Sequence, residues 1–546
     1  GHCGKGIQMN TLLAGAPPAV PLVPGGSRPL EALPLLTPGD MRRTEAQAFA
    51  RGVPSLLLME HAAQAVTDAL EKALGGCRGN RVLFLCGPGN NGGDGLAAAR
   101  LFRQRGGLAE IWLSGAPKTP EARAQLQWAE ALSLPIAHIY ALSPQARPFT
   151  PEGAPRGEYA FDGYVDALLG TGLRGAPDAL TALLIGVPAH DLRPGRRPVV
   201  AVDIPSGMDG RTGACPGGAC LRADVTVTFH APKPGLYLTP RREDAGEIVI
   251  ADIGLWDMDE DVLALDAPEL SCQALLPGLL GRLKPRPLAA HKGDCGRVLI
   301  YAGSLGMAGA AAMCAQAAVA AGAGLTTVAC PREIMPVLQI LAPNAMCVEI
   351  GAAVRRPPAH DVLALGPGLG QSEEIWQNIL ALYNPETPSV WDADALNLLS
   401  LHPDFRLGEN AVITPHPGEA ARLLGWEMGR VLADRFGTAQ ALAEKLGCTA
   451  LLKGDVTLLA RQDASGPRFA LSANGAPALA KGGSGDVLSG MLAALRPGRT
   501  PWEATALACV WHGLAGRAGE ARYGQLELTS AQLIACLHAA RTGERK

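Results

Sequence analysis

The sequence has almost no net charge, no paired cysteine motif and no long, strongly apolar run. Its 48 Lys and Arg residues are balanced by 51 Asp and Glu residues, which gives a net charge of −3. This balance provides no electrostatic basis for binding nucleic acid or an anionic membrane. None of the 13 cysteines forms a Cys-x-x-Cys pair or a Cys/His zinc spacing. We therefore expect small buried thiols in a reducing compartment, and a cytoplasmic protein.

Two segments were considered as a possible signal peptide and a possible membrane span. Residues 1–35 are rich in proline and lack a basic segment joined to an unbroken apolar run, so we expect an irregular extension rather than a signal peptide. Residues 307–325 carry no charge, but they consist mainly of Ala and Gly. Such weak hydrophobicity favours a helix packed on a sheet over a membrane span.

The composition suits a large, folded, multidomain protein. Hydrophobic residues make up 48% of the chain and charged residues 18%. A chain of 546 residues is too long for one ordinary core, so two or more domains are expected. The 67 glycines and 44 prolines indicate many short turns between elements.

The first half, residues 36–256, alternates short apolar strands with helical patterns. Because the strands are apolar on both faces and helices lie between them, the pattern predicts a doubly wound parallel sheet. Residues 257–290 are acidic first and proline-rich later, which is typical of a linker leading into the next domain. The predicted strands are 81–86, 109–113, 164–168, 199–202, 225–229 and 247–250.

A second alternation of strands and helices fills residues 291–540. The two halves show no obvious internal repeat, so we expect two different α/β folds fused in one chain. The predicted strands of this half are 297–301, 325–329, 361–365, 389–391, 411–413 and 450–452.

A glycine-rich loop follows the first strand of the first half. It carries the spacing Gly87-x-Gly89-x-x-Gly92, but the next strand ends in Ser114 without the acidic residue that a dinucleotide-binding fold uses to hold a ribose. The side chains Asn90, Asn91 and Asp94 remain; their oxygens could coordinate a hard cation or hold a polar ligand. A simple Asn/Gly turn is the alternative.

Two further strand ends carry polar groups. Asp166 lies in an apolar strand before a glycine loop, and Asp203 ends the next strand, close to Ser206. Because the carboxyl ends of parallel strands share one edge of a sheet, these side chains are expected to converge on Asn91. Each carboxylate could instead cap a turn.

In the second half, a glycine turn leads into an apolar helix at Asp486. Such a helix start binds anions, and a carboxylate placed there makes sense if it takes a proton from a hydroxyl that attacks a phosphate. A helix cap is the alternative reading. Lys453 could reach a nucleotide phosphate, or it could be a surface charge. Residues 366–370 could form an anion-binding nest or a plain turn. His416 stands between two prolines.

The strings around these residues resemble known families. Gly-Pro-Gly-Asn-Asn-Gly-Gly-Asp-Gly, Asp-Ala-Leu-Leu-Gly-Thr-Gly-Leu and Val-Asp-Ile-Pro-Ser-Gly are similar to the NAD(P)H-hydrate epimerases. The second half resembles the ADP-dependent NAD(P)H-hydrate dehydratases of the ribokinase-like superfamily. The resemblance leaves out only the first 35 residues or so. It implies a Rossmann-like domain followed by a ribokinase-like domain. The first would epimerise the hydrates of NADH and NADPH, and the second would dehydrate the S-hydrate while ADP becomes AMP and phosphate.

For the first domain, the resemblance implies a K⁺ site and a hydrate pocket. The K⁺ ligands would be Asn91, Asp166 and Ser206, and Asp203 would be the catalytic proton shuttle. The implied hydrate-binding residues are Asn90, Asn91, Gly92, Gly93, Asp94, Gly170, Thr171, Gly172, Leu173, Arg174, Gly175, Ala176 and Asp203.

For the second domain, the resemblance implies that Asp486 is the catalytic base and that Mg²⁺ and ADP bind beside it. Ribokinase-like folds often associate, so we expect a homo-oligomer acting on small molecules, without nucleic acid or membrane. A true small-molecule kinase is the alternative for this half, and a non-catalytic sensing module is the alternative for the first half. The implied nucleotide-binding residues are Lys453, Gly454, Asp455, Val456, Thr457, Gly483, Ser484 and Gly485, where Ser484 replaces a frequent Ala, and the hydrate-binding residues are Ala323, Gly368, Gly370, His416 and Asp486.

Overall fold

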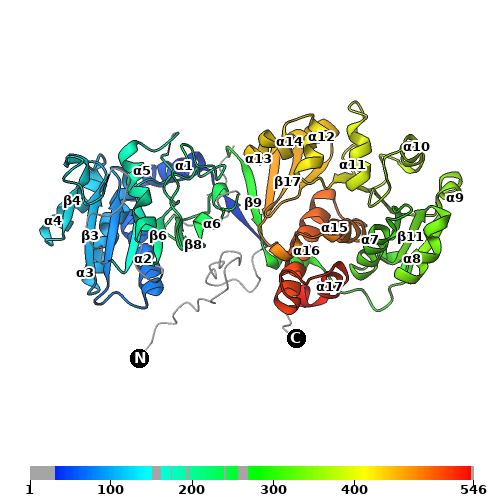
Figure 1. Ribbon diagram of the computed structural model, residues 1–546, viewed down its shortest axis with the longest axis horizontal. Coiled ribbons are helices and arrows are strands. Elements are labelled where there is room, and N and C mark those ends of the chain that lie inside the picture. The colour runs from blue at the N-terminus through cyan, green and yellow to red at the C-terminus, as the bar shows by residue number, and fades with distance from the viewer. Residues whose placement is uncertain are drawn as a thin grey trace. The chain divides into compact units, whose positions relative to one another are not determined.

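The computed structural model shows a chain of two compact units (Figure 1). Residues Pro34–Glu269 form the first unit, and Leu270–Lys546 form the second together with Gly26–Leu33. The prediction of two α/β domains is confirmed. The structure describes residues 31–150, 161–173, 175–191, 195, 197–238, 242–255 and 268–542.

The first unit contains a seven-stranded sheet in the order β4-β3-β2-β5-β6-β7-β8, with every pair parallel. The strand order reverses between β2 and β5, and α/β folds bind ligands at the carboxyl ends of such neighbouring strands. The strands are β2 (Arg81–Cys86), β3 (Leu108–Leu113), β4 (Ile136–His138), β5 (Gly163–Ala167), β6 (Val199–Val202), β7 (Val225–Phe229) and β8 (Glu247–Ala251).

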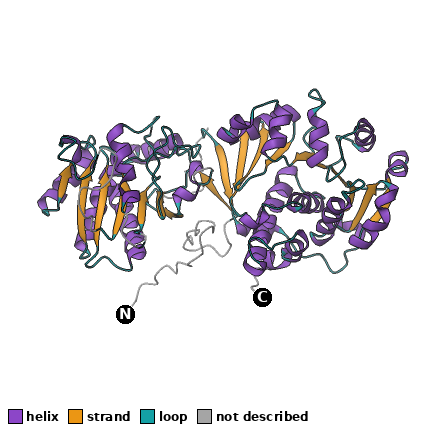
Figure 2. Cartoon of the chain, in the orientation of Figure 1, coloured by secondary structure: helices purple, strands orange, loops and turns teal. Residues whose placement is uncertain are grey.

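Both faces of this sheet are buried under helices (Figure 2). In β2, Val82 and Phe84 join the core beneath α2 and α3, whereas Leu83 and Leu85 join the core beneath α5. This alternation explains why the strand is apolar throughout. The helices are α1 (Pro38–Ala50), α2 (Ser55–Leu74), α3 (Asn90–Gln104), α4 (Pro120–Ala131), α5 (Ala179–Gly186) and α6 (Arg242–Ala245).

The second unit contains an eleven-stranded sheet in the order β1-β9-β18-β17-β16-β15-β14-β13-β10-β11-β12. It is parallel from β12 to β16, β17 and β18 are antiparallel to their preceding neighbours, and the order reverses around β10. The strands are β1 (Ala32–Leu35), β9 (Ser271–Leu275), β10 (Arg297–Tyr301), β11 (Leu325–Cys330), β12 (Met346–Glu349), β13 (Val362–Leu365), β14 (Ser389–Trp391), β15 (Ala411–Ile413), β16 (Thr449–Leu452), β17 (Thr457–Asp463) and β18 (Gly466–Ser472).

The uncharged stretch 307–325 contains helix α7, which packs against α15 (Figure 1). The contact is so close that a Cβ atom on Gly490 of α15 would lie 2.0 Å from the carbonyl oxygen of Cys314. The predicted packed helix is confirmed, and none of the described helices is long and apolar enough to cross a membrane. The helices are α7 (Ala308–Ala320), α8 (Met335–Leu341), α9 (Ile350–Arg355), α10 (Glu373–Leu382), α11 (Ala393–Ser400), α12 (Pro417–Leu424), α13 (Met428–Ala433), α14 (Arg435–Leu446), α15 (Ser484–Leu495), α16 (Pro501–Tyr523), α17 (Ser530–Ala535) and α18 (Leu537–Thr542).

The sequence analysis did not predict two short strands, far apart in the chain, at one side of the second sheet. Residues 32–35 of the expected irregular extension form β1, and residues 271–275 of the expected linker region form β9. The two strands are neighbours in the second sheet, so backbone pairing rather than local composition decides their structure. Residues 1–30 and 256–267 of these two predicted segments lie outside the described residues.

Candidate active sites

The carboxyl ends of β5 and β6 are joined by a buried carboxylate. Asp166 accepts hydrogen bonds from the Ser206 amide (2.7 Å) and from the Ser206 hydroxyl (2.6 Å). The amide of Leu168 adds a third bond at 3.3 Å. Because Asp166 is fully buried, its pKa is raised to about 6. The expected convergence of Asp166 and Ser206 is present, and Asp166 also caps the loops as the alternative reading had it.

Asn91 lies beside the loop that follows β5. A Cβ atom on Gly170 would stand 2.8 Å from the side-chain oxygen of Asn91. The preceding amide of Leu169 donates to the Ser206 hydroxyl at 2.9 Å, so this loop links Asn91 to Ser206. The amide nitrogen of Asn91 is buried without a partner. These side chains offer oxygen atoms, which suit a hard cation, and no cluster of three His, Cys, Asp or Glu residues with metal-site geometry occurs in the described part of the chain.

Asp203 sits on a left-handed backbone, with φ of +66°, directly after β6. Its Oδ1 atom accepts a bond from the ammonium group of Lys233, which has no exposed surface. Thr228 adds a hydroxyl donor at 3.2 Å and Phe229 an amide donor at 3.4 Å. Lys233 was missed by the sequence analysis, although it stands between two prolines, the same signal that drew attention to His416.

Two further carboxyl groups face Asp203. Burial, followed by the charges of Asp203 and Glu45, raises the pKa of Asp94 well above its ordinary value. Burial and the charge of Asp203 likewise raise the pKa of Glu45 on α1. The first site therefore brings three acidic groups and one lysine together. Glu45 was not predicted, because it comes from a helix that precedes the sheet.

The remaining predicted residues of the first site occupy the glycine-rich loops. Gly92 packs so tightly that a Cβ atom would lie 1.8 Å from the Gly87 carbonyl oxygen. The carbonyl of Thr171 accepts a bond from Arg42 at 3.0 Å. Arg174 lies outside the described residues, whereas Asn90, Gly93, Gly172, Leu173, Gly175 and Ala176 lie in the α3 start and in the loop after β5.

The second site is built around the start of α15. Gly483 caps this helix with φ of +92°, and Asp486 lies in its first turn. Burial is the largest cause that raises the pKa of Asp486 to about 7; the charges of Asp392 and Asp394 add to it, and Lys453 opposes it. A carboxylate with a pKa near neutrality is suited to accept a proton.

Lys453 is an ion-paired residue rather than a free surface charge. Its ammonium group donates to Asp392 at 2.7 Å, and the hydroxyl of Ser489 on α15 donates to the other oxygen of Asp392 at 2.7 Å. A Cβ atom on Gly485 would lie 3.4 Å from the Lys453 nitrogen. Burial disfavours the charge of Lys453, but Asp392 and Glu419 outweigh it, so its pKa is raised. The α15 start, Lys453 and Asp392 thus form one cluster.

The loop that follows Lys453 is held by a buried arginine from α14. Arg435 donates to the carbonyl of Val456 at 2.6 Å and pairs with Asp455 at 3.6 Å. A Cβ atom on Gly454 would lie 2.6 Å from its guanidinium group. Thr457 begins β17 directly after this loop. Arg435 was missed, since nothing in the local sequence of α14 connects it to residues 453–457.

His416 caps helix α12 and is half-exposed. Its Nδ1 atom accepts bonds from the amides of Gly418 (2.9 Å) and Glu419 (3.3 Å), and its own amide donates to the Glu419 carboxylate at 2.8 Å. Burial and the nearby charges of Lys453 and Arg422 lower the pKa of His416. The remaining ring nitrogen is 3.4 Å from Glu419. The prediction that His416 is displayed rather than buried in the core is confirmed.

Two of the predicted contacts differ from expectation. The amide of Gly370 donates to Asp394 at 2.9 Å, so it is not a free donor for an anion-binding nest, and Gly368 has its carbonyl bonded to Ser304 at 2.8 Å. Ala323 lies after α7 and before β11, at the amino edge of the sheet. Because α7 carries the chain from one edge to the other, roughly 20 Å for a helix of this length, the structure does not bring Ala323 together with Asp486.

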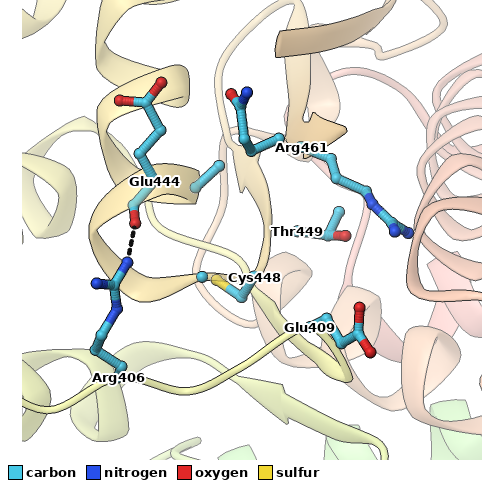
Figure 3. Close-up of a pocket in the computed structure, with 9 residues that line it drawn as sticks. Arg406, Glu409, Glu444, Cys448, Thr449 and Arg461 are labelled. Atoms are coloured by element: carbon cyan, nitrogen blue, oxygen red, sulfur yellow. Dashed lines mark hydrogen bonds between the residues drawn. The ribbon is translucent and has the colours of Figure 1, made fainter. Parts of the chain in front are cut away.

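A pocket outside both sites opens at the amino end of β16 (Figure 3). Thr449 begins this strand, and parallel strands place their starts at the edge opposite their carboxyl ends. None of the predicted site residues lines the pocket. Its lining residues are Arg406, Glu409, Ala443, Glu444, Gly447, Cys448, Thr449, Arg461 and Gln462.

The folds and their carboxyl-edge sites define a two-domain α/β enzyme in which a Rossmann-like domain precedes a ribokinase-like domain. Two family models match the chain, one described as YjeF-related protein N-terminus over residues 55–235 and one as NAD(P)H-hydrate dehydratase over residues 298–538. The chain is 38% identical over 513 residues to the bifunctional NAD(P)H-hydrate repair enzyme Nnr of Escherichia coli (strain K12), covering 91% of this chain and 92% of that protein. The chain therefore belongs to the family of bifunctional NAD(P)H-hydrate repair enzymes.

Other relatives agree with this assignment. The protein of the same name from Moorella thermoacetica is 35% identical over 523 residues, covering 92% of this chain and 95% of its own. Among solved structures, the ADP/ATP-dependent NAD(P)H-hydrate dehydratase of Bacillus subtilis, co-crystallised with ATP and Mg²⁺, matches 48% of this chain and 95% of its own. That match has 27% identity and a TM-score of 0.44. The family resemblance seen in the sequence is confirmed.

Proposed function

We propose that this chain repairs hydrated nicotinamide cofactors in two steps. The first domain interconverts the R and S hydrates of NADH and NADPH, and the second dehydrates the S-hydrate to NAD(P)H while ADP becomes AMP and phosphate. The observation that carries the proposal is the cluster at the start of α15, where Asp486 has a pKa of about 7 next to the Lys453–Asp392 ion pair. A base and a cation beside a helix start are the parts that phosphoryl transfer to an alcohol requires.

In the first domain, the substrate carries a hydroxyl on the ring carbon beside the ring nitrogen. The nitrogen lone pair can expel this hydroxyl group, or the hydroxyl oxygen can lose its proton and form a carbonyl while the carbon–nitrogen bond breaks and its electron pair moves to nitrogen. Bond formation on the other face then inverts the carbon. Asp203 exchanges the proton that this inversion requires. Its position at the carboxyl end of β6, next to buried Asp94, supports that role.

A K⁺ ion fits the oxygen atoms of Asn91, Asp166 and Ser206. The fit rests on the neutral amide and hydroxyl oxygens combined with one carboxylate, whose burial raises its pKa. Bound there, K⁺ would supply a positive charge that holds the loops after β2, β5 and β6 in register.

In the second domain, hydroxide is a poor leaving group and has to be activated. Asp486 takes the proton of the hydroxyl, whose oxygen then bonds to the terminal phosphorus of ADP while AMP leaves. The ring nitrogen lone pair next expels phosphate, and loss of a proton from the neighbouring ring carbon restores the double bond of the reduced ring. Mg²⁺, held at the phosphates of the nucleotide, supplies charge neutralisation when bound.

The nucleotide would bind along residues 453–457 and the glycine turn 483–485. Arg435 supports the first segment through Val456 and Asp455. His512 supports the second, because its ring nitrogen donates to the Ser484 carbonyl at 2.9 Å, and burial lowers its pKa to about 4, so that the ring stays neutral. Both supports come from other helices, α14 and α16. Hydrate contacts from His416 complete the proposed site.

The test is incubation of the full chain with purified NADH-hydrate epimers, ADP and Mg²⁺. Recovery of nicotinamide absorbance together with release of AMP and phosphate is the expected result. A stable phosphorylated product without reduced cofactor would favour the small-molecule kinase instead. The homo-oligomeric state and the cytoplasmic location also remain part of this proposal, and light scattering of the purified chain tests the former.

A further inference from the structure

Lys233 is the most deeply buried cation of the first unit's site. It follows β7 and precedes the turn Pro234–Leu236, and none of its surface is exposed. Its ammonium group donates to Asp203 Oδ1, to the hydroxyl of Thr228 (3.0 Å) and to the carbonyl of Phe229 (3.2 Å). All three of its hydrogens are therefore used inside the protein. Burying a lysine in this way is costly unless its charge is paired, so the ion pair with Asp203 is what makes the arrangement stable.

The same contacts involve only one of the two carboxylate oxygens of Asp203. Every hydrogen bond that the described residues donate to Asp203 ends on Oδ1, from Lys233, Thr228 and Phe229. Oδ2 receives no such bond and is not enclosed by the protein. The left-handed backbone at Asp203 fixes the carboxylate in this orientation. One oxygen is thus anchored and the other is available to a ligand.

The charges around Asp203 would otherwise oppose its ionisation. Asp94 on α3 and Glu45 on α1 are the titratable groups that face it, and Arg42 on α1 acts on Glu45. Two carboxyl groups in a buried site disfavour a third negative charge. Among the described residues, Lys233 is the cation in direct contact with Asp203, so its charge offsets those of the two neighbouring acids.

We propose that Lys233 is a positioning residue for epimerisation, which holds one oxygen of Asp203 and directs the other oxygen toward the hydroxyl of the hydrate. The inference rests on the proton-exchange role of Asp203 proposed above. The proton that leaves the hydroxyl passes to Oδ2 as the electron pair of the breaking ring bond moves to nitrogen. It returns to oxygen when the bond forms again on the other face. Lys233 itself neither gains nor loses a proton.

The experiment compares the pH profile of epimerisation in the full-length wild type, Lys233→Met, Lys233→Gln and Lys233→Arg. At neutral pH, Lys233→Met should lower kcat/KM by about 100-fold. The acid limb of its profile should move upward by about one pH unit or more, because no cation then offsets the charges of Asp94 and Glu45. Lys233→Gln should show the same displacement, whereas Lys233→Arg should keep the wild-type limb.

Two controls separate this role from a general loss of structure. Dehydration of the pure S-hydrate by the second domain should be unchanged in every variant, and Lys72→Met, which removes an exposed ion pair with Glu247, should leave epimerisation unchanged. A loss that is equal at all pH values, or no loss, would overturn the role of Lys233. If Asp203→Asn keeps full epimerisation, the proposed function of Asp203 fails instead, whatever Lys233 does.

Discussion

The two sites place a cation differently with respect to the acid that would move the proton. In the first, the ammonium of Lys233 contacts Asp203 itself. In the second, the ammonium of Lys453 contacts Asp392, and Asp486 is left beside that pair with a pKa of about 7. The buried carboxylate of Asp486, without a cation in direct contact, is the one whose pKa is raised toward neutrality. The difference suits a reversible proton exchange in one domain and an activated attack on phosphate in the other.

The largest effect is expected when the unpaired acid is removed. Asp486→Asn should lower dehydration by about 1,000-fold, because the amide cannot take the hydroxyl proton. Nucleotide binding should persist, and epimerisation by the first domain should be unchanged. Recovery of nicotinamide absorbance measures the first effect and calorimetric titration with ADP the second. Intact dehydration in this variant would contradict the role of Asp486.

Removing Lys453 should leave Asp392 as an unpaired negative charge beside Asp486. In Lys453→Met, Asp392 loses its partner, so its charge should raise the pKa of Asp486 further. Dehydration at neutral pH should fall by about 100-fold and recover in part at higher pH. Lys445→Met, on the same domain and bonded only to the Leu423 carbonyl, is the matched control. A loss without any change in pH profile would mean that Lys453 serves nucleotide binding alone.

In the wild-type enzyme, dehydration and epimerisation should depend differently on pH. Because Asp486 must be deprotonated to act, kcat/KM for dehydration should fall about tenfold for each pH unit below its pKa of about 7. Epimerisation, which depends on Asp203 and not on Asp486, should not share this acid limb. Both rates can be followed in one preparation by chromatography of the epimers. Coincident acid limbs would remove the distinction between the sites.

The smallest effect concerns stability rather than rate. Ser206→Ala removes the 2.6 Å hydroxyl donor to fully buried Asp166, which should lower the free energy of unfolding of the first domain by about 1–3 kcal/mol. Ser55→Ala, whose hydroxyl bonds to Glu121 in a partly exposed position, should change it by about 0.5 kcal/mol at most. Denaturant titration of the two variants provides the measurement. Equal stabilities would show that the Asp166–Ser206 link does not hold the loops.

Strand ends are the features that the sequence predicted well. Asp166 and Ser206 meet because parallel strands bring their carboxyl ends to one edge, and this follows from topology alone. Strands β2 and β10 were also predicted correctly, because buried strands require continuous apolar sequences. Asp486 in the first turn of α15 was located by its glycine turn.

The partners of these residues could not be predicted in the same way. Lys233 pairs with Asp203 from 30 positions away and Lys453 with Asp392 from 61, and no local pattern encodes such contacts. Arg435 and Glu45 belong to helices whose sequences look ordinary. Ala323 was assigned to the site by the family resemblance alone, and it lies between α7 and β11.

The neighbouring positions of β1 and β9 have a consequence for dissecting the protein. In topological terms the whole first domain is an insertion between two adjacent strands of the second domain's sheet. A fragment that begins at residue 291 would lose both strands. It would leave β18 as an unpaired edge strand, which promotes aggregation. The natural unit for expressing the dehydratase half is therefore β1 joined by a short loop to residues 270–542, with the epimerase half excised from within.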